Sequence, residues 1–102
     1  MTDRELRLLG LGLRAGSVAV GTAAVRAALQ RGEIHLVVVA RDSSRRTEEK
    51  VTRLARSTGV RTVAGPRATE LGNHLGRAAI QSLGIRDRHL AAGIGGGISR
   101  DR

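Results

Sequence analysis

The chain of 102 residues contains no cysteine, phenylalanine, tyrosine or tryptophan. Without cysteine it has no disulfide, no thiolate metal site and no thiol nucleophile. Without aromatic rings it cannot stack bases on aromatic platforms, which excludes RRM-type sites and the usual OB-fold sites. Any recognition of nucleic acid would have to use backbone groups, arginine and small apolar residues.

Long apolar segments are absent as well. The longest strongly apolar stretch is Leu36–Ala40, whereas a membrane-spanning helix needs about 20 such residues. The first ten residues, MTDRELRLLG, carry four charges where a signal peptide would need an apolar run. We therefore expect no membrane segment and no export, and a cytoplasmic location, which the lack of cysteine also suits.

Acidic residues are scarce relative to basic ones. There are 9 Asp and Glu against 18 Lys and Arg, a formal net charge of +9, and Lys50 is the single lysine. This balance predicts a polyanionic partner. Arginine holds a phosphate with two hydrogen bonds and stacks on bases, so an arginine-rich surface favours RNA. A GC-rich genome would explain part of the arginine excess, but not the net charge.

Helical and strand patterns alternate along the chain. Helices are predicted at 3–15, 22–30, 43–57, 69–75 and 88–92, and strands at 17–20, 34–40, 60–64 and 78–85. The apolar run at 34–40, rich in β-branched residues and interrupted only by His35, is typical of a strand buried on both faces. Such alternation predicts an α/β fold, a three-layer α/β/α sandwich with helices on both faces of a small sheet. The length suits one domain, residues 1–94, followed by a flexible glycine-rich basic tail, 95–102.

The segment from Ala15 to Asp42 contains the clearest candidate site. A strand leads through Gly21 and Thr22 into a helix, and the next strand ends at Arg41 and Asp42. The start of such a helix offers unpaired backbone N–H groups and the positive end of its dipole, which suit a phosphate or a nucleotide edge. In this basic chain, the pattern points to nucleic acid.

Four stretches of the sequence carry a family resemblance: LLGLGLRAGSVAVGTAAVRAALQRGEIHLVVVARDSS, KVTRLARSTGVRTVAG, TELGNHLGR and LGIRDRHLAAGI. Read together, over residues 3–94, they resemble the small ribosomal-type RNA-binding proteins of the kink-turn-binding superfamily, and within it the bacterial YlxQ-like branch. The resemblance implies a mixed sheet of about four strands. It also implies binding of a sharply bent RNA internal loop in which tandem sheared G·A pairs follow a bulge.

Carried over residue by residue, the resemblance places RNA contacts on the second helix, after the 34–40 strand, and on both sides of the fourth helix. These positions are Gly21, Thr22, Ala23, Ala24, Ala27, Arg41, Asp42, Arg67, Ala68, Arg77, Ala78 and Ala79. The family's strong binders carry asparagine, glutamate and lysine where this chain has Ala23, Ala24 and Ala27. Alanine cannot hydrogen-bond a guanine edge, and each lost base contact costs about 1–3 kcal/mol. Arg26, one position before Ala27, is the candidate that compensates through the RNA backbone.

Neither a metal site nor a catalytic site is predicted. His35, His74 and His89 have no short ligand spacing between them and no cysteines near them. Ser82, Asp87 and His89 lack the nucleophile elbow and oxyanion-hole motifs of a hydrolase. We therefore expect a non-catalytic, cofactor-free, monomeric protein that binds structured RNA, such as ribosomal RNA, and no small-molecule substrate. The alternative is a protein-interaction module on the same fold, and an enzyme is the least favoured option because no acid, base or nucleophile set is apparent.

Overall fold

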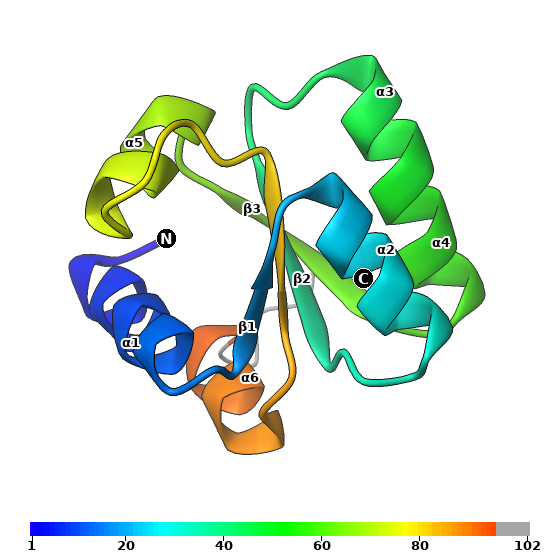
Figure 1. Cartoon of the computed structure of the whole chain (residues 1–102), viewed down its shortest axis with the longest axis horizontal. Coiled ribbons are helices and arrows are strands. Elements are labelled where there is room, and N and C mark those ends of the chain that lie inside the picture. The colour runs from blue at the N-terminus through cyan, green and yellow to red at the C-terminus, as the bar shows by residue number, and fades with distance from the viewer. Residues whose placement is uncertain (96–102) are drawn as a thin grey trace.

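The computed structural model describes residues 1–95, in which a four-stranded mixed sheet lies between two layers of helices (Figure 1). The strands are β1 Val18–Val20, β2 Leu36–Ala40, β3 Arg61–Gly65 and β4 Ser82–Ile85. Their order in the sheet is β1-β4-β2-β3; β4 is antiparallel to both of its neighbours, and β2 is parallel to β3. The predicted three-layer α/β/α sandwich is confirmed.

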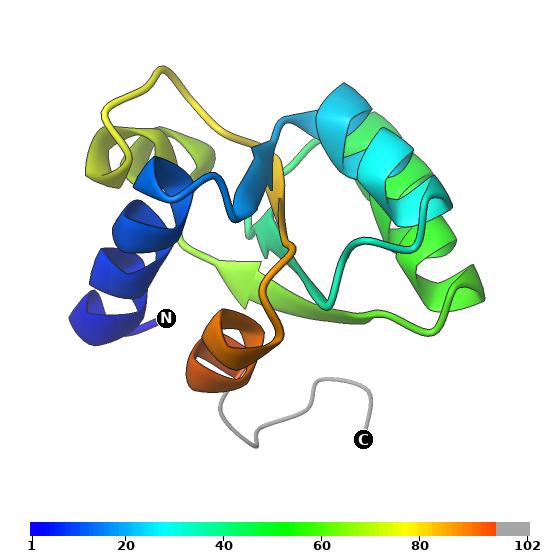
Figure 2. The same ribbon diagram turned by 60° about the horizontal axis from the view of Figure 1, so that its bottom comes forward.

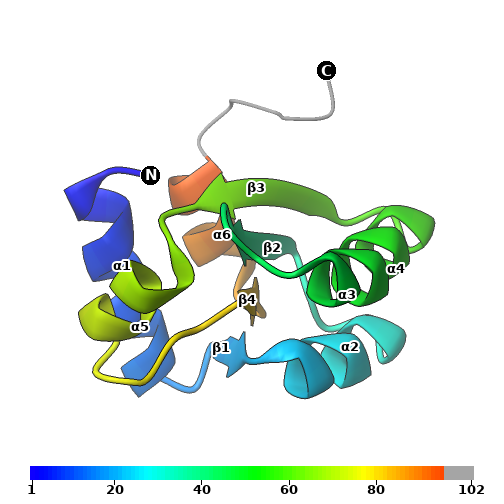
Figure 3. The same ribbon diagram turned by 90° about the horizontal axis from the view of Figure 1, so that it is seen from above.

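Helices cover both faces of the sheet. They are α1 Asp3–Arg14, α2 Thr22–Gln30, α3 Arg45–Thr47, η1 Glu48–Thr52, α4 Arg53–Ser57, α5 Ala68–His74 and α6 Arg88–Gly95. Seen from above, α1, α5 and α6 lie on one side of the strands, and α2 with α3 and α4 on the other (Figure 3). The same two groups separate in the tilted view of Figure 2.

Each layer of helices seals its own apolar core. One core joins Leu9 of α1 and Leu71 of α5 to the strand residues Val38, Leu83 and Ile85. The second core packs helices α2, η1 and α4 on the other face; its members include Val25, Leu29, Val37, Val39, Val51 and Ala55. Adjacent side chains of β2 enter different cores because strand residues alternate between faces. All five residues of β2 are buried, as predicted, but the strand begins at Leu36 rather than at the predicted residue 34, and His35 is exposed.

The helix predicted at 43–57 begins two residues later and is not regular throughout. Ser44 is its N-cap, with the Ser44 side chain accepting from the N–H of Thr47 at 3.1 Å. The middle turn, η1, is π-helical rather than α-helical. The expectation of cap-type serines was right, whereas the π turn has no sequence signal that we recognise.

Two predicted boundaries near the C-terminus were wrong. The last strand starts at Ser82, not Ala78, because the N–H of Ile80 donates to the carbonyl of Ala68 at 2.9 Å instead of joining the sheet. The final helix continues past Ala92 to Gly95, since Ile94 is buried in the first core. Residues 96–102 of the predicted tail lie outside the described residues.

No helix within residues 1–95 combines the length and the apolar character that crossing a bilayer requires.

Candidate nucleic-acid interface

The sheet topology brings the predicted contact segments to one end of the molecule. Strands β1, β2 and β3 run in the same direction and β4 runs against them. The carboxyl ends of the first three strands and the start of β4 therefore meet at one edge. Figure 1 shows this edge at the top, where the turn into α2, the loop into α3 and the loop from α5 to β4 lie.

Gly21 shapes the entry to α2. Its backbone has φ 93° and ψ 155°, a conformation that residues with a side chain rarely adopt. The N–H of Gly21 donates to the carbonyl of Ser82 at 3.0 Å, which fixes the turn on β4. No side chain among residues 1–95 caps the first turn of α2, and Ala23 and Ala24 are exposed. The start of this helix therefore presents backbone N–H groups to solvent.

A hydroxyl network links the start of α2 to the neighbouring loops. The hydroxyl oxygens of Thr22 and Thr47 lie 3.4 Å apart, and the Ser44 hydroxyl donates to that of Thr47 at 3.1 Å. The Ser44 N–H in turn donates to the side-chain carbonyl of Gln81 at 2.8 Å. Three segments distant in sequence are thus held together. Ser44, Thr47 and Gln81 were not among the predicted site residues; the Ser44-x-x-Thr47 cap spacing was a usable signal, and Gln81 had none.

Asp42 fixes the start of α5. Its carboxylate accepts a 2.8 Å hydrogen bond from the N–H of Ala68, and the N–H of Arg41 donates to the carbonyl of Pro66 at 3.2 Å. The side chains of Arg41 and Arg67 are exposed beside these bonds. Asp42 thus has a structural role at the predicted site, since its carboxylate is already engaged with the protein backbone.

The loop from α5 to β4 is held by a close approach at Gly72. A Cβ at this position would collide with the backbone of Arg77 and Ala78. The N–H of Arg77 donates to the carbonyl of Gly72 at 2.8 Å. Arg77, Ala78 and Ala79 remain exposed, so the loop is anchored at its base and open outward.

Arg26 lies on α2 three residues after the exposed Ala23, a spacing at which helix side chains are neighbours. It is one helical turn after Thr22 and so shares the side of α2 that faces Thr47, about 100° around the helix from Ala27. The side chain is half-buried, and its Nε is buried without a hydrogen-bond partner. A donor that has lost water and found no acceptor is unusual in a folded protein.

The residues that suggested other chemistry are not arranged for it. Ser82 is fully buried in β4, while Asp87 and His89 are exposed beyond the opposite end of that strand. Among residues 1–95, no group of three or more His, Asp or Glu residues is placed to hold a metal ion.

The structure is thus an α/β/α sandwich in which the start of α2, after Gly21, and the arginine-bearing loops lie at one end of the sheet. The sequence model of the Ribosomal protein L7Ae/L30e/S12e/Gadd45 family matches residues 6–91, and the chain belongs to this family. The predicted family resemblance is confirmed at the level of this family, and membership supports RNA binding of the ribosomal-protein kind.

Comparison with other proteins adds the fold of one solved structure. This is a protein with unknown function from Bacillus halodurans C, with 25% sequence identity and a TM-score of 0.85. The match covers 91% of this chain and 94% of that one. No curated protein matches the chain.

Proposed function

We propose that this protein is a non-catalytic RNA-binding protein that recognises structured RNA, of the kink-turn or ribosomal type, through the start of α2 and the adjacent loops. The observation that carries the proposal is the convergence of exposed arginines from three loops on one sheet edge. These are Arg41, Arg67 and Arg77. Among residues 1–95, ion pairs join only Arg31 and Arg86 to Glu33. Arg41, Arg67 and Arg77 are therefore not paired with a carboxylate and are available to a ligand.

The chemistry of this surface favours the RNA backbone over the bases. Arginine side chains and helix-start N–H groups bind phosphate oxygens, which position a protein without reading sequence. Ala23, Ala24 and Ala27 supply no donor or acceptor for a guanine edge. Phosphate contacts should therefore provide most of the affinity, and recognition should depend mainly on the bent shape of the RNA. We also expect the protein to act in the cytoplasm, as a monomer and without a cofactor.

Filter binding tests this function directly. A kink-turn duplex is compared with the same duplex after its G·A pairs are changed to Watson–Crick pairs, at two salt concentrations. Each phosphate contacted should contribute a slope of roughly −0.7 to −0.9 to the log–log dependence of affinity on salt. Equal binding of both duplexes would refute kink-turn specificity, and no binding of either would refute the function.

A protein-interaction module is the second candidate, favoured by the exposed Ala23 and Ala24. Small side chains on a helix start allow close approach of a partner backbone, and the surrounding arginines suit an acidic protein. A complex that forms with protein and persists at high salt, while RNA binds weakly, would favour this alternative.

A further inference from the structure

The end of the sheet opposite the proposed interface holds a basic cavity. It has a volume of about 240 Å³ and lies between the start of β3, the start of β2 and helix α6. Its lining residues are His35, Leu36, Arg61, Arg88, Ala91 and Ala92. The arginines come from two different elements, the edge strand β3 and the helix α6, which packs on the sheet.

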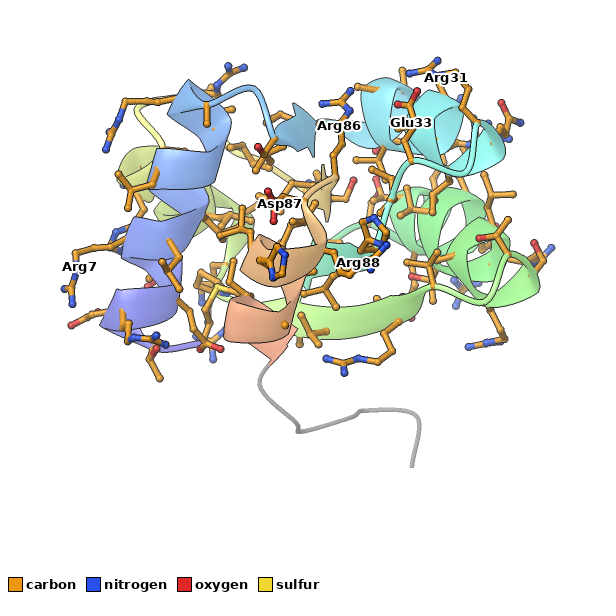
Figure 4. All side chains as sticks on the ribbon, turned by 90° about the horizontal axis from the view of Figure 1, so that it is seen from below. Arg7, Arg31, Glu33, Arg86, Asp87 and Arg88 are labelled. Carbon is orange, nitrogen blue, oxygen red and sulfur yellow. The ribbon has the colours of Figure 1, made fainter. Side chains whose placement is uncertain are left out.

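Two carboxylates, Glu33 and Asp87, lie close in sequence to the lining residues His35 and Arg88, and both accept hydrogen bonds within the protein. Glu33 accepts hydrogen bonds from Arg31 at 2.9 and 3.2 Å and lies 3.5 Å from Arg86 (Figure 4). The hydrogen bond from Arg31 lowers the pKa of Glu33. Asp87 accepts the N–H of Leu90 at 2.9 Å at the start of α6. Within residues 1–95, neither Arg61 nor Arg88 forms an ion pair with a carboxylate.

The Nε of Arg61 lacks a hydrogen-bond acceptor. Arg61 pairs with Leu36 in the parallel register of β2 and β3, on the face of the sheet that α6 covers. Its Nε is buried and has no hydrogen-bond partner. A buried N–H without an acceptor is costly, and a ligand oxygen would remove that cost if the guanidinium turned toward the cavity. The Arg61 side chain is half-buried and lines the cavity, and Nε is the one nitrogen of its guanidinium that is buried without a partner.

We infer that Arg61 and Arg88 form a second phosphate-binding site, which holds the backbone of a second RNA segment. Two guanidinium groups bind phosphate oxygens through short charge-assisted hydrogen bonds, and the exposed His35 adds a ring N–H donor. The strongly basic chain favours a nucleic-acid phosphate as the source of the anion. Because the two sites lie at opposite ends of the sheet, one protein would connect two RNA segments. This inference goes beyond the proposed function, which needs only the first site.

Arginine side-chain NMR tests this second site independently of the proposed interface at the start of α2. The Nε–Hε signals of Arg61 and Arg88 are followed during separate titrations with a short blunt RNA duplex and with inorganic phosphate. Both signals should shift with the duplex and, more weakly, with phosphate. A response to phosphate alone would overturn the RNA assignment in favour of a free-anion site, and no response to either would remove the site.

A bridging assay tests the consequence. A donor-labelled kink-turn RNA and an acceptor-labelled blunt duplex are mixed with protein, and energy transfer reports a complex that contains both. Arg88 is exposed in the first turn of α6. Arg88→Ala should weaken bridging about fivefold, because it removes one surface charge contact. Its affinity for the kink-turn RNA alone should stay within about twofold. Arg61→Gln keeps part of the stem over Leu36 and should act in the same direction.

Arg7→Ala is the matched control, since Arg7 is an exposed arginine of α1 that lines neither this cavity nor the neighbouring one that Arg61 shares with Arg56 (Figure 4). It should leave bridging unchanged. Equal loss in Arg7→Ala and Arg88→Ala would overturn the site in favour of general charge. If the wild-type protein does not bind kink-turn RNA but the blunt duplex still shifts the Arg61 signal, the proposed function would be wrong and this site would remain.

Discussion

The carboxylate of Asp42 accepts a 2.8 Å hydrogen bond from the backbone N–H of Ala68. These residues are 26 positions apart, yet the bond joins the loop after β2 to the first turn of α5. A negative side chain at the start of a helix is favoured by the free N–H groups and by the helix dipole. The same bond places Arg41 and Arg67, which flank it in sequence, at the same end of the sheet.

Replacing Asp42 tests how much this bond contributes. Asp42→Ala removes the acceptor and should lower the free energy of unfolding by about 1 kcal/mol, the usual effect of losing a helix cap. Asp42→Asn keeps an acceptor oxygen and should lose less. Urea unfolding of the three proteins measures both values. Equal stability of wild type and Asp42→Ala would mean that the bond contributes nothing in solution.

Gly72→Ala tests the anchoring of the loop that carries Arg77. The added Cβ would meet the backbone of Ala78, which is not able to rotate away as a side chain does. We expect a loss of about 1–3 kcal/mol in stability, as for other overpacked sites, together with weaker RNA binding. Thermal unfolding and filter binding give the two readouts.

Gly10→Ala is the control for that substitution. Gly10 lies inside α1, where a Cβ would meet only Leu75, at an ordinary contact distance of 4.0 Å. Because alanine favours a helix more than glycine does, this variant should be about 0.5–1 kcal/mol more stable than wild type. Equal destabilisation of both variants would argue that the Ala78 contact is not special.

The contrast between these glycines shows what the sequence was able to predict. The spacing of hydrophobic residues, the helix-cap residues and the glycines at helix ends predicted the order of helices and strands and the buried central strand β2, because these signals are local. The close approach of Gly72 to Ala78 and the bond from Asp42 to Ala68 depend on tertiary packing, and no local pattern specifies such partners. The last strand was predicted too long for the same reason: Ile80 reads as a strand residue, but its N–H is used by α5.

The site shows a similar division. The positions carried over from the family resemblance are gathered at one end of the sheet, so their proximity follows from topology. Their role in RNA binding stays a prediction. The hydroxyl network of Thr22, Thr47 and Ser44 was missed because threonine and serine have weak sequence preferences except at caps.

Arg26→Ala tests whether Arg26 contributes to RNA binding from its half-buried position. If its guanidinium reaches a phosphate, the substitution should weaken binding about fivefold and reduce the magnitude of the salt slope by roughly 0.7 to 0.9. Filter binding over a range of salt concentrations supplies both numbers. Arg53→Ala, an exposed arginine of α4, is the control and should change neither. Unchanged affinity and slope in Arg26→Ala would remove Arg26 from the site.

Stability should depend on pH through Asp87. The hydrogen bond from the N–H of Leu90, helped by His89, lowers the pKa of this carboxyl in the folded protein. Because the folded-state pKa lies below the unfolded one, the charge contributes stability above about pH 4, and this contribution is lost as pH falls through the folded-state pKa.

Asp87→Asn isolates this charge, since asparagine also caps a helix. The variant should be less stable than wild type at about pH 6, and the difference should be smaller at about pH 2, below the pKa of a free aspartate. Urea unfolding at both pH values measures it. A difference that is the same at both pH values would rule out the charge as its cause.

The strongest test of the interface is a gain of function. The resemblance implies that strong kink-turn binders carry asparagine, glutamate and lysine at the positions of Ala23, Ala24 and Ala27. The first two alanines are exposed and the third is half-buried at the surface of α2, so the larger side chains can be built without disturbing the core. If the geometry of Gly21 and α2 is that of an RNA-recognition helix, Ala23→Asn, Ala24→Glu and Ala27→Lys together should raise affinity for a kink-turn duplex.

Each restored base contact contributes about 1–3 kcal/mol, so the affinity of the triple variant should rise by at least tenfold. The duplex with Watson–Crick pairs in place of the G·A pairs should gain little, because the new side chains read base edges that it does not present. Added charge alone is not a sufficient explanation, since glutamate and lysine cancel. Equal gains for both duplexes would mean that the new groups act without base recognition, and no gain for either would place the RNA elsewhere on the molecule.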